Sequence, residues 1–205
     1  MNTVHAFCAL PFRKMKFDAE GNVTMCCFQE RRCLGNILDS TLEDIWYSPL
    51  AQDIRHWTEL NRLHERCRID SCPYRHLPEQ TPHQVHHAFY PVEFEIDLPN
   101  QHCNIGGEEP SAEHPACFMC ERHLNFVKQE DKVDEVCRRI NPYMRYIQSL
   151  HIQGVAEPFW KDRIFTVLDL LEGDSHKHHF CLSTTTNGTI LNEERIDRFL
   201  RYPYS

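Results

Sequence analysis

The cysteine content constrains this chain more than any other feature. Eleven of its 205 residues are cysteine, and the N-terminus has neither the basic leader nor the apolar core of a secretory signal. Many cysteines in a chain without an export signal point to metal or cluster ligands rather than to disulfides. We therefore expect a cytoplasmic protein whose thiols bind a metal ion or an iron–sulfur cluster.

Composition makes two kinds of partner improbable. The formal net charge is −8, and acids separate the basic residues, so we expect no nucleic-acid partner. With 41% hydrophobic and 25% charged residues, the chain resembles an ordinary globular protein. No apolar run approaches the roughly 20 residues of a membrane span. We expect no membrane contact.

The chain divides into two halves with different patterns. Residues 1–74 hold widely spaced cysteines among short elements, and residues 91–205 alternate strand-like with helix-like segments. Residues 75–90 contain Pro78, Pro82 and many His and Gln without a hydrophobic period, which is typical of a linker. We predict a small cysteine-rich α+β domain, a linker and a larger α/β domain.

In the first half, a hairpin is predicted around Gly21. Residues 15–17 and 23–25 flank a glycine-containing turn, which is the usual pattern of two short antiparallel strands. The hairpin would bring Cys8 near Cys26.

Two helices are predicted next. Ser40 and Glu43 match a capping box that starts a short helix through Trp46, and Ser48–Pro49 opens a second helix. Its apolar stripe, which we interpret as core, consists of Leu50, Ile54, Trp57 and Leu60. Two further thiols, Cys67 and Cys72, follow this helix.

In the second half, three strands alternate with three helices. The strands are predicted at residues 92–98, 147–153 and 180–186, and the helices carry apolar stripes within residues 133–140, 160–171 and 196–200. Such alternation predicts parallel strands joined by right-handed crossovers, with ligands at the carboxyl ends of the strands. We interpret Cys137 and Cys181 as small buried hydrophobes.

Each segment that follows a predicted strand carries groups suited to a ligand. After the first strand come Cys103, Cys117 and Cys120; three thiolates on an iron–sulfur cube leave one iron open for another ligand. Glu157 follows the second strand and could hold an ammonium group. Residues 184–189 follow the third strand and offer hydroxyl and amide groups. A structural zinc site or unliganded thiols are the alternatives for the three cysteines.

In this order of motifs, residues 91–205 resemble the radical SAM superfamily. The family shows a three-cysteine loop after its first strand, a Gly-Gly-Glu-Pro-like motif after the second and a Thr-Asn-Gly segment after the third. The resemblance implies that Cys103, Cys117 and Cys120 hold a catalytic [4Fe-4S] cluster that binds S-adenosylmethionine. The positions implied to face that cofactor are Met119, Gly154, Glu157, Ser183 and Asn187.

Residues 1–74 resemble a SPASM-type auxiliary-cluster domain. The resemblance rests on Cys8, Gly21, Cys26, residues 35–37, residues 44–46, Arg55, Cys67 and Cys72. It implies a second [4Fe-4S] cluster on Cys8, Cys26, Cys67 and Cys72. Cys27 could replace Cys26, Cys33 is a spare thiol, and zinc is a rival occupant because four cysteines also make a tetrahedral site.

Together the resemblances imply a radical SAM enzyme or a truncated form of one. It would cleave S-adenosylmethionine reductively and abstract hydrogen from a substrate, which we expect to be a peptide or protein, with electrons from a reductase or a flavodoxin-like donor. The second half is long enough for about three strand–helix units, half of the family's barrel, so we expect a second subunit to complete the site. The alternative is a non-catalytic cluster- or zinc-binding module that senses redox state or scaffolds a partner.

Overall fold

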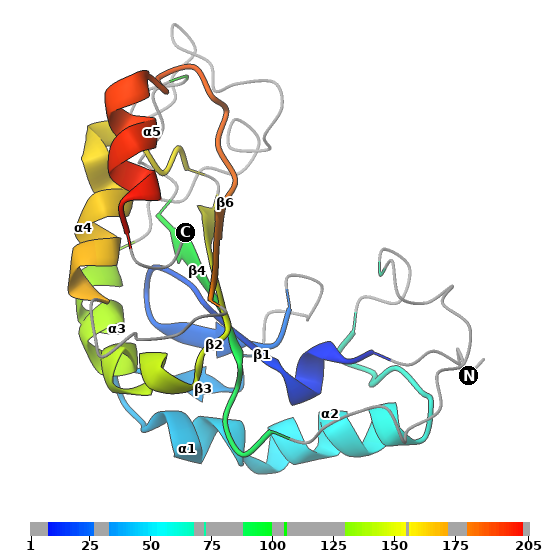
Figure 1. The fold of residues 1–205 in the computed structure, drawn as a ribbon. Coiled ribbons are helices and arrows are strands. Elements are labelled where there is room, and N and C mark those ends of the chain that lie inside the picture. Colours follow the sequence, from blue (N-terminus) through cyan, green and yellow to red (C-terminus); the bar gives the residue numbers. More distant parts are fainter. Residues whose placement is uncertain are drawn as a thin grey trace, which may run out of the picture.

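The computed structural model describes residues 8–26, 33–67, 72, 88–99, 105, 130–154, 156–171 and 180–202 (Figure 1). Its strands form one six-stranded sheet in the order β3-β2-β1-β4-β5-β6. The strands are β1 (Lys14–Phe17), β2 (Asn22–Thr24), β3 (Gly35–Asn36), β4 (Glu93–Leu98), β5 (Ser149–Gly154) and β6 (Cys181–Thr184). The helices are η1 (Leu10–Phe12), α1 (Leu42–Trp46), α2 (Pro49–Glu59), α3 (Val133–Ile140), η5 (Asn141–Tyr146), η6 (Trp160–Asp162), α4 (Arg163–Leu170) and α5 (Glu193–Leu200).

The predicted hairpin is confirmed. β1 and β2 pair antiparallel, and Gly21 in the turn has φ +86°, a conformation that glycine adopts without strain. The Asp18 carboxylate accepts hydrogen bonds from the backbone N–H groups of Glu20 and Asn22, both at 2.9 Å, and so fixes the turn.

The capping box of α1 lies one residue later than predicted. Thr41, not Ser40, is the N-cap, and its hydroxyl accepts from the Asp44 N–H at 3.1 Å while the Asp44 carboxylate accepts from the Thr41 N–H at 3.4 Å. Asp44 therefore replaces Glu43 as the reciprocal partner. The predicted start of α2 is confirmed, because the Ser48 hydroxyl accepts from Ala51 N–H and Pro49 occupies the first turn.

The buried face of α2 differs from the predicted stripe. Ala51, Ile54 and Thr58 are buried, whereas Leu60 is 52% exposed. The helix ends at Glu59, and Asn61 takes a positive φ of 55°, so Leu60 lies past the last helical turn. A hydrogen bond of 2.9 Å from the Thr58 hydroxyl to the Ile54 carbonyl satisfies the one buried hydroxyl on this face.

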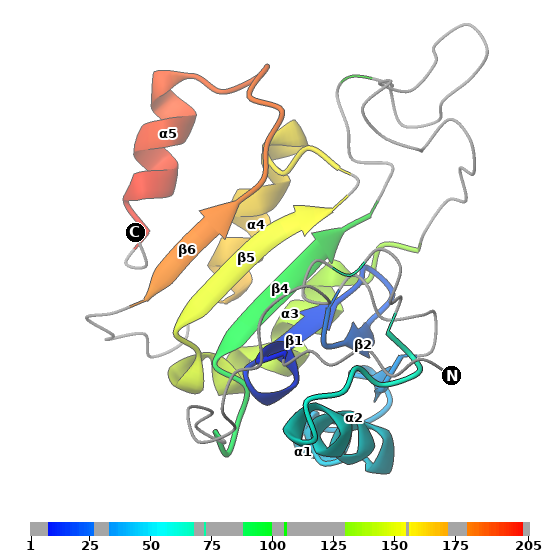
Figure 2. The same ribbon diagram turned by 90° about the vertical axis from the view of Figure 1, so that its right-hand side faces the viewer.

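The three predicted strands of the second half are confirmed as parallel neighbours. β4 pairs parallel with β5, and β5 pairs parallel with β6. Figure 2 shows α3 and α4 behind these strands, on one face of the sheet. The expected partial barrel is not confirmed, because the described strands form an open sheet rather than a closed one.

The two halves of the chain meet in this sheet. β1 from the first half pairs parallel with β4 from the second, with Lys16 opposite Glu95 and Phe17 opposite Ile96. The rings of Phe17 and Phe94 lie 5.0 Å apart in an edge-to-face contact. One hydrophobic core therefore draws residues from both halves. The division of the chain at residues 75–90 stays a prediction, because residues 73–87 lie outside the described part.

The two cysteines interpreted as buried hydrophobes have different positions. Cys137 on α3 is fully buried in the core, as predicted. The prediction for Cys181 is wrong, because this residue is exposed. Cys181 begins β6, an outer strand of the sheet, and shares its face with Ser183 rather than with the buried Leu150 and Ile152.

Within the described ranges, no helix combines the length and the apolar character that crossing a bilayer requires.

Gly154 at the end of β5 provides a test of how closely β4 and β5 pack. A Cβ atom there would lie 2.5 Å from the Leu98 carbonyl oxygen, and φ is +138°. We expect Gly154→Ala to lower the free energy of unfolding by about 1–3 kcal/mol more than Gly188→Ala. Gly188 also has a positive φ, +72°, but a Cβ there meets nothing within 4 Å, so it isolates the backbone contribution. Equal losses in urea-unfolding experiments would contradict the close packing.

Candidate functional site

The carboxyl ends of β4, β5 and β6 lie side by side, as the sequence predicts. Leu98 is opposite Gly154, and the Thr185 N–H donates to the Ile152 carbonyl at 3.4 Å. The segments that leave these strands therefore start from one edge of the sheet. Cys103, Cys117, Met119 and Cys120 lie outside the described residues, so their convergence stays a prediction.

Glu157 ties two of these segments together. It follows β5, and its side chain is 0% exposed. One carboxylate oxygen, Oε1, accepts from the Thr186 hydroxyl at 2.7 Å and from the Phe159 N–H at 3.2 Å. The other, Oε2, accepts from the Asn187 N–H at 2.7 Å. These charge-assisted bonds fix the segment after β6 against the segment after β5.

Gly154, Asn187 and Ser183, all predicted to face a cofactor, have partners within the protein. The tight approach of Leu98 explains why position 154 needs glycine. The Asn187 side-chain oxygen accepts from the N–H and hydroxyl groups of Thr189, at 3.0 and 2.7 Å. The Ser183 hydroxyl bonds to His151 Nδ1 at 2.8 Å. Only Glu157 and Asn187 are brought into direct contact with each other among these predicted residues of the described chain.

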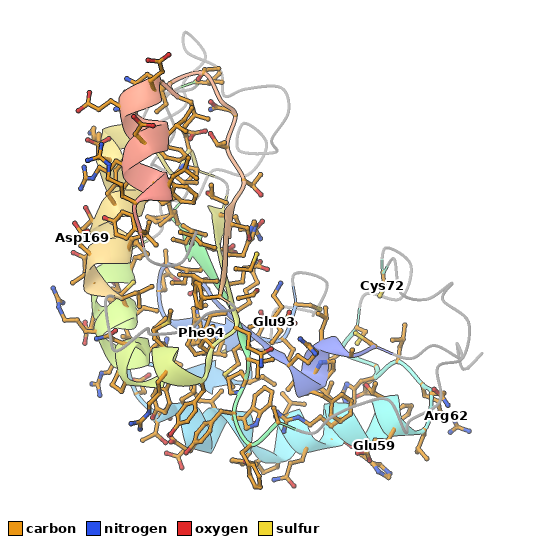
Figure 3. The ribbon with its side chains drawn as sticks, viewed as in Figure 1. Glu59, Arg62, Cys72, Glu93, Phe94 and Asp169 are labelled. Carbon is orange, nitrogen blue, oxygen red and sulfur yellow. The ribbon has the colours of Figure 1, made fainter. Side chains whose placement is uncertain are left out.

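The sequence-based prediction missed a polar network on the open face of the sheet. Lys16 Nζ lies 2.8 Å from Glu95 Oε1 and 2.5 Å from Asp97 Oδ2, and Lys14 also pairs with Glu95. In Figure 3, Phe94 lies on the side of the helices and Glu93 on the opposite side. The ion pairs therefore occupy the face that α3 and α4 leave open.

The pKa values of Lys16, Glu95 and Asp97 are shifted in this network. Burial favours neutral Lys16, but Asp97 and Glu95 outweigh it and raise the pKa of Lys16. Burial also favours neutral Glu95, but hydrogen bonds from Lys14 and Lys16 hold its pKa below the usual range. For Asp97 burial prevails over the attraction of Lys16 and raises the pKa. Of the two carboxylates, Glu95 is the one that the lysines keep firmly ionised.

The network continues across β5 to β6. Gln153 donates through Nε2 to Glu95, and its Oε1 lies 3.1 Å from His151 Nε2. With that contact His151 carries its proton on Nε2, and Nδ1 accepts from Ser183. A strict polar–apolar alternation in residues 93–98 and 149–153 is the sequence signal for this face.

The thiols of the first half gather at a separate place. Cys72 is buried beside Leu63, and Cys8 and Cys67 pack against this pair. Burial raises the pKa of Cys8 to about 12, and the charges of Cys26, Cys67 and Cys72 act in the same direction. Burial likewise raises the pKa of Cys67 to about 12, with Cys26 and Cys72 adding to the effect. Cys8 and Cys67 are therefore both close enough to Cys26 and Cys72 for a charge on those residues to act on them.

A buried histidine holds the segment that carries Cys67. The Cys67 N–H donates to the His64 carbonyl at 2.9 Å. His64 is 3% exposed, its Nε2 lies 3.0 Å from the Asp53 carboxylate on α2, and its Nδ1 accepts from the Arg66 N–H at 3.1 Å. In Figure 3, Cys72 lies above the C-terminal part of α2, away from the layer of α3, α4 and α5.

The first-half thiols are chemically suited to bind a metal ion or an iron–sulfur cluster. Thiolates suit zinc and iron–sulfur clusters, and a cation would offset the burial that disfavours ionised thiols here. Across the described segments, however, no group of three or more His, Cys, Asp or Glu side chains is arranged to hold a metal ion.

Cys8, Cys67 and Cys72 lie together in one small cluster of the first half. Comparison with protein families identifies this region: residues 8–73, about a third of the chain, match the SPASM iron–sulfur cluster-binding domain. The chain thus contains a region of an iron–sulfur cluster-binding type, in the place where the sequence resemblance put it. Neither the curated proteins nor the solved structures include a match to this chain. Cys26 contributes to the shifts of both Cys8 and Cys67, while Cys27 lies outside the described residues.

The role of Glu157 as a clasp between two segments can be measured. In Glu157→Gln, an amide NH₂ replaces one oxygen and faces a donor, so at least one buried donor loses its acceptor. We expect the free energy of unfolding to fall by about 1–3 kcal/mol. The control is Asp197→Asn on the exposed surface of α5, for which a change within about 0.5 kcal/mol is expected. Similar values for both variants in urea unfolding would contradict the clasp.

Proposed function

We propose that this chain is a radical SAM enzyme, or a truncated form of one, with an auxiliary cluster domain at its N-terminal end. The family match concerns residues 8–73; one structural observation supports a radical SAM core in the second half. β4, which leads toward Cys103, has its carboxyl end beside Gly154, and Glu157 joins the segment after β5 to the one that contains Asn187. Parallel α/β sheets bind their ligands at this edge.

In this proposal the catalytic [4Fe-4S] cluster is held by Cys103, Cys117 and Cys120. When bound, the cluster would supply one electron to S-adenosylmethionine, which would break a carbon–sulfur bond and give methionine and a 5'-deoxyadenosyl radical able to abstract hydrogen from a substrate. Glu157 and the Gly154 backbone would meet the methionyl ammonium, and Met119 would lie near the adenine. Asn187 and Ser183 would complete the cofactor side, and the protein would orient the reactants and exclude water.

The N-terminal site would hold a second cluster through Cys8, Cys26, Cys67 and Cys72. The packing of Cys8 and Cys67 against Cys72, and the effect of the Cys26 charge on Cys8, support this ligand set. The family match supports iron and sulfide over zinc. That the cluster is of the [4Fe-4S] type is part of the proposal. His64 would act as a positioning residue for Cys67 through its carbonyl.

A second subunit is proposed to complete the groove. In the described sheet β6 has β5 as its partner and offers its other edge, and an uncovered edge favours pairing with another strand. On α5, which follows β6, Ile196 is 44% and Leu200 58% exposed, which supports a covered surface in the assembly. The substrate class we propose is a peptide or protein, and the electron donor a reductase or a flavodoxin-like protein.

A second candidate function is a non-catalytic cluster-binding module with a redox-sensing or scaffolding role. The observation that favours it is that both carboxylate oxygens of Glu157 already accept protein hydrogen bonds. A carboxylate whose acceptor sites are already used by protein donors binds an ammonium group less strongly.

Anaerobic reconstitution with iron and sulfide separates the two candidates. For the enzyme, we expect dithionite and S-adenosylmethionine to yield 5'-deoxyadenosine. Cys117→Ala should lose this cleavage and about half of the bound iron, and Cys67→Ala should lose about half of the iron while retaining cleavage. The exposed Cys181 provides the matched control, because Cys181→Ala should change neither quantity. Bound zinc without iron, or no cleavage in the reconstituted wild type, would refute the enzyme.

A further inference from the structure

A row of polar side chains crosses the open face of the sheet, with one residue from each of four strands. Lys16 on β1 is in register with Glu95 on β4, Glu95 with His151 on β5, and His151 with Ser183 on β6. Because residues in register share a face of the sheet, all four point to the side that α3 and α4 leave open (Figure 2). His151 and Ser183 are half-buried, so both stay within reach of a ligand on this face.

The charged end of this row fixes the direction of its hydrogen bonds. Two lysines pair with Glu95, and a carboxylate that is ionised in this way can only accept. The amide NH₂ of Gln153 therefore faces Glu95, and its oxygen faces His151 Nε2 at 3.1 Å, so that this nitrogen carries the proton. Nδ1 is left as an acceptor, and the Ser183 hydroxyl donates to it at 2.8 Å.

This direction decides what the Ser183 hydroxyl can offer a ligand. Its hydrogen is engaged with His151, and the hydroxyl has no other partner in the described part of the chain. The Thr185 hydroxyl, 3.2 Å from Nε2, accepts from the same N–H as Gln153 and does not compete for Nδ1. Ser183 therefore presents only oxygen lone pairs, which call for a ligand with a hydrogen-bond donor.

A second proton on His151 would reverse this polarity. Histidine is the side chain whose ordinary titration falls between pH 5 and pH 8. When Nδ1 takes up a proton from solvent it becomes a donor, the Ser183 oxygen accepts from it, and the hydroxyl hydrogen turns toward the ligand. Gln153 continues to accept from Nε2, so the change needs no movement of the surrounding side chains.

Several other titratable groups share this face with His151. In the described strands they are Lys14 and Lys16 on β1, Glu93, Glu95 and Asp97 on β4, and Cys181 on β6. Burial raises the pKa of Asp97 despite the attraction of Lys16. A pH dependence of binding at this face must therefore be assigned to His151 by variants that remove its titration alone.

We propose that His151 is a positioning residue, which makes the Ser183 hydroxyl an acceptor for S-adenosylmethionine at neutral pH and a donor when the imidazole is protonated. The inference rests on the proposed function, in which Ser183 lies on the cofactor side. S-adenosylmethionine is rich in donors and carries a sulfonium and an ammonium charge. Both the reversed hydroxyl and the new charge on His151 would oppose its binding, so the affinity should fall as the pH falls.

The test measures S-adenosylmethionine binding to the full-length, cluster-reconstituted protein by anaerobic equilibrium dialysis. We expect about fourfold weaker binding at about pH 6 than at about pH 8, which lie on either side of the ordinary histidine pKa. Equal affinity at the two pH values would overturn the inference and leave the proposed function standing. No binding at either pH would refute the proposed function, and the inference with it.

Two variants and a control assign the effect to His151. The side-chain oxygen of His151→Asn can accept from Ser183 but does not titrate, so this variant should bind as the wild type does at about pH 8 and show no decline at about pH 6. His151→Phe offers no acceptor and should bind about tenfold more weakly at both pH values. His56→Asn, which removes an exposed histidine on α2, should keep the wild-type decline. A full decline in His151→Asn would assign the titration to another group, such as Asp97, and overturn the inference.

Discussion

The parallel pairing of β1 with β4 is the contact on which the rest of the structure depends. Lys16 lies between Glu95 and Asp97 on one face, while Phe17 and Phe94 meet on the other. The pair joins two parts of the chain about 80 residues apart and makes one sheet of them. Without it, the hairpin and the three parallel strands would each expose an apolar face, and neither part would have the core that both share.

The polar face of the sheet departs from the usual parallel arrangement. Parallel strands are commonly buried on both faces and read as continuous apolar runs. Here β4 and β5 alternate, and on the open face Lys14, Lys16 and Glu95 are paired rather than solvated. Opposite charges on neighbouring strands stabilise one register, because a slip of one residue would turn the charges into the core.

The sequence predicted local elements well and long-range pairing poorly. The hairpin at Gly21 and the burial of Cys137 follow from turn residues and from periods of two and 3.6, which act over short distances. The parallel pairing of β4, β5 and β6 was predicted because strands alternate with helices in this half. The pairing of β1 with β4 depends on contacts far apart in the chain. Its signal, two lysines in one alternating segment and three acids in another, is visible only when both segments are read together.

For the candidate site, the sequence pointed to individual residues but not to the contacts between them. Residue type and position identified Glu157 and Asn187, but not that they bond to each other, because that contact depends on how two segments leave adjacent strands. The exposure of Cys181 was missed for a related reason: the position of a strand at the border of a sheet is a property of topology, not of composition. The first-half thiols were proposed as ligands from the resemblance to a SPASM-type domain, and the structure adds His64, whose carbonyl accepts from the Cys67 N–H.

The buried carboxylate of Glu157 has a thermodynamic consequence for anything that binds at this edge. Its two oxygens already hold Thr186, Phe159 and Asn187, so the protein supplies its own competitor. An incoming cation would gain only the difference between its bonds and those it displaces. Release of Asn187 would also loosen the segment after β6. Binding of a cation to Glu157 would therefore reduce the order of the segment after β6. A ligand that leaves the internal hydrogen bonds of Glu157 intact would be favoured over one that breaks them.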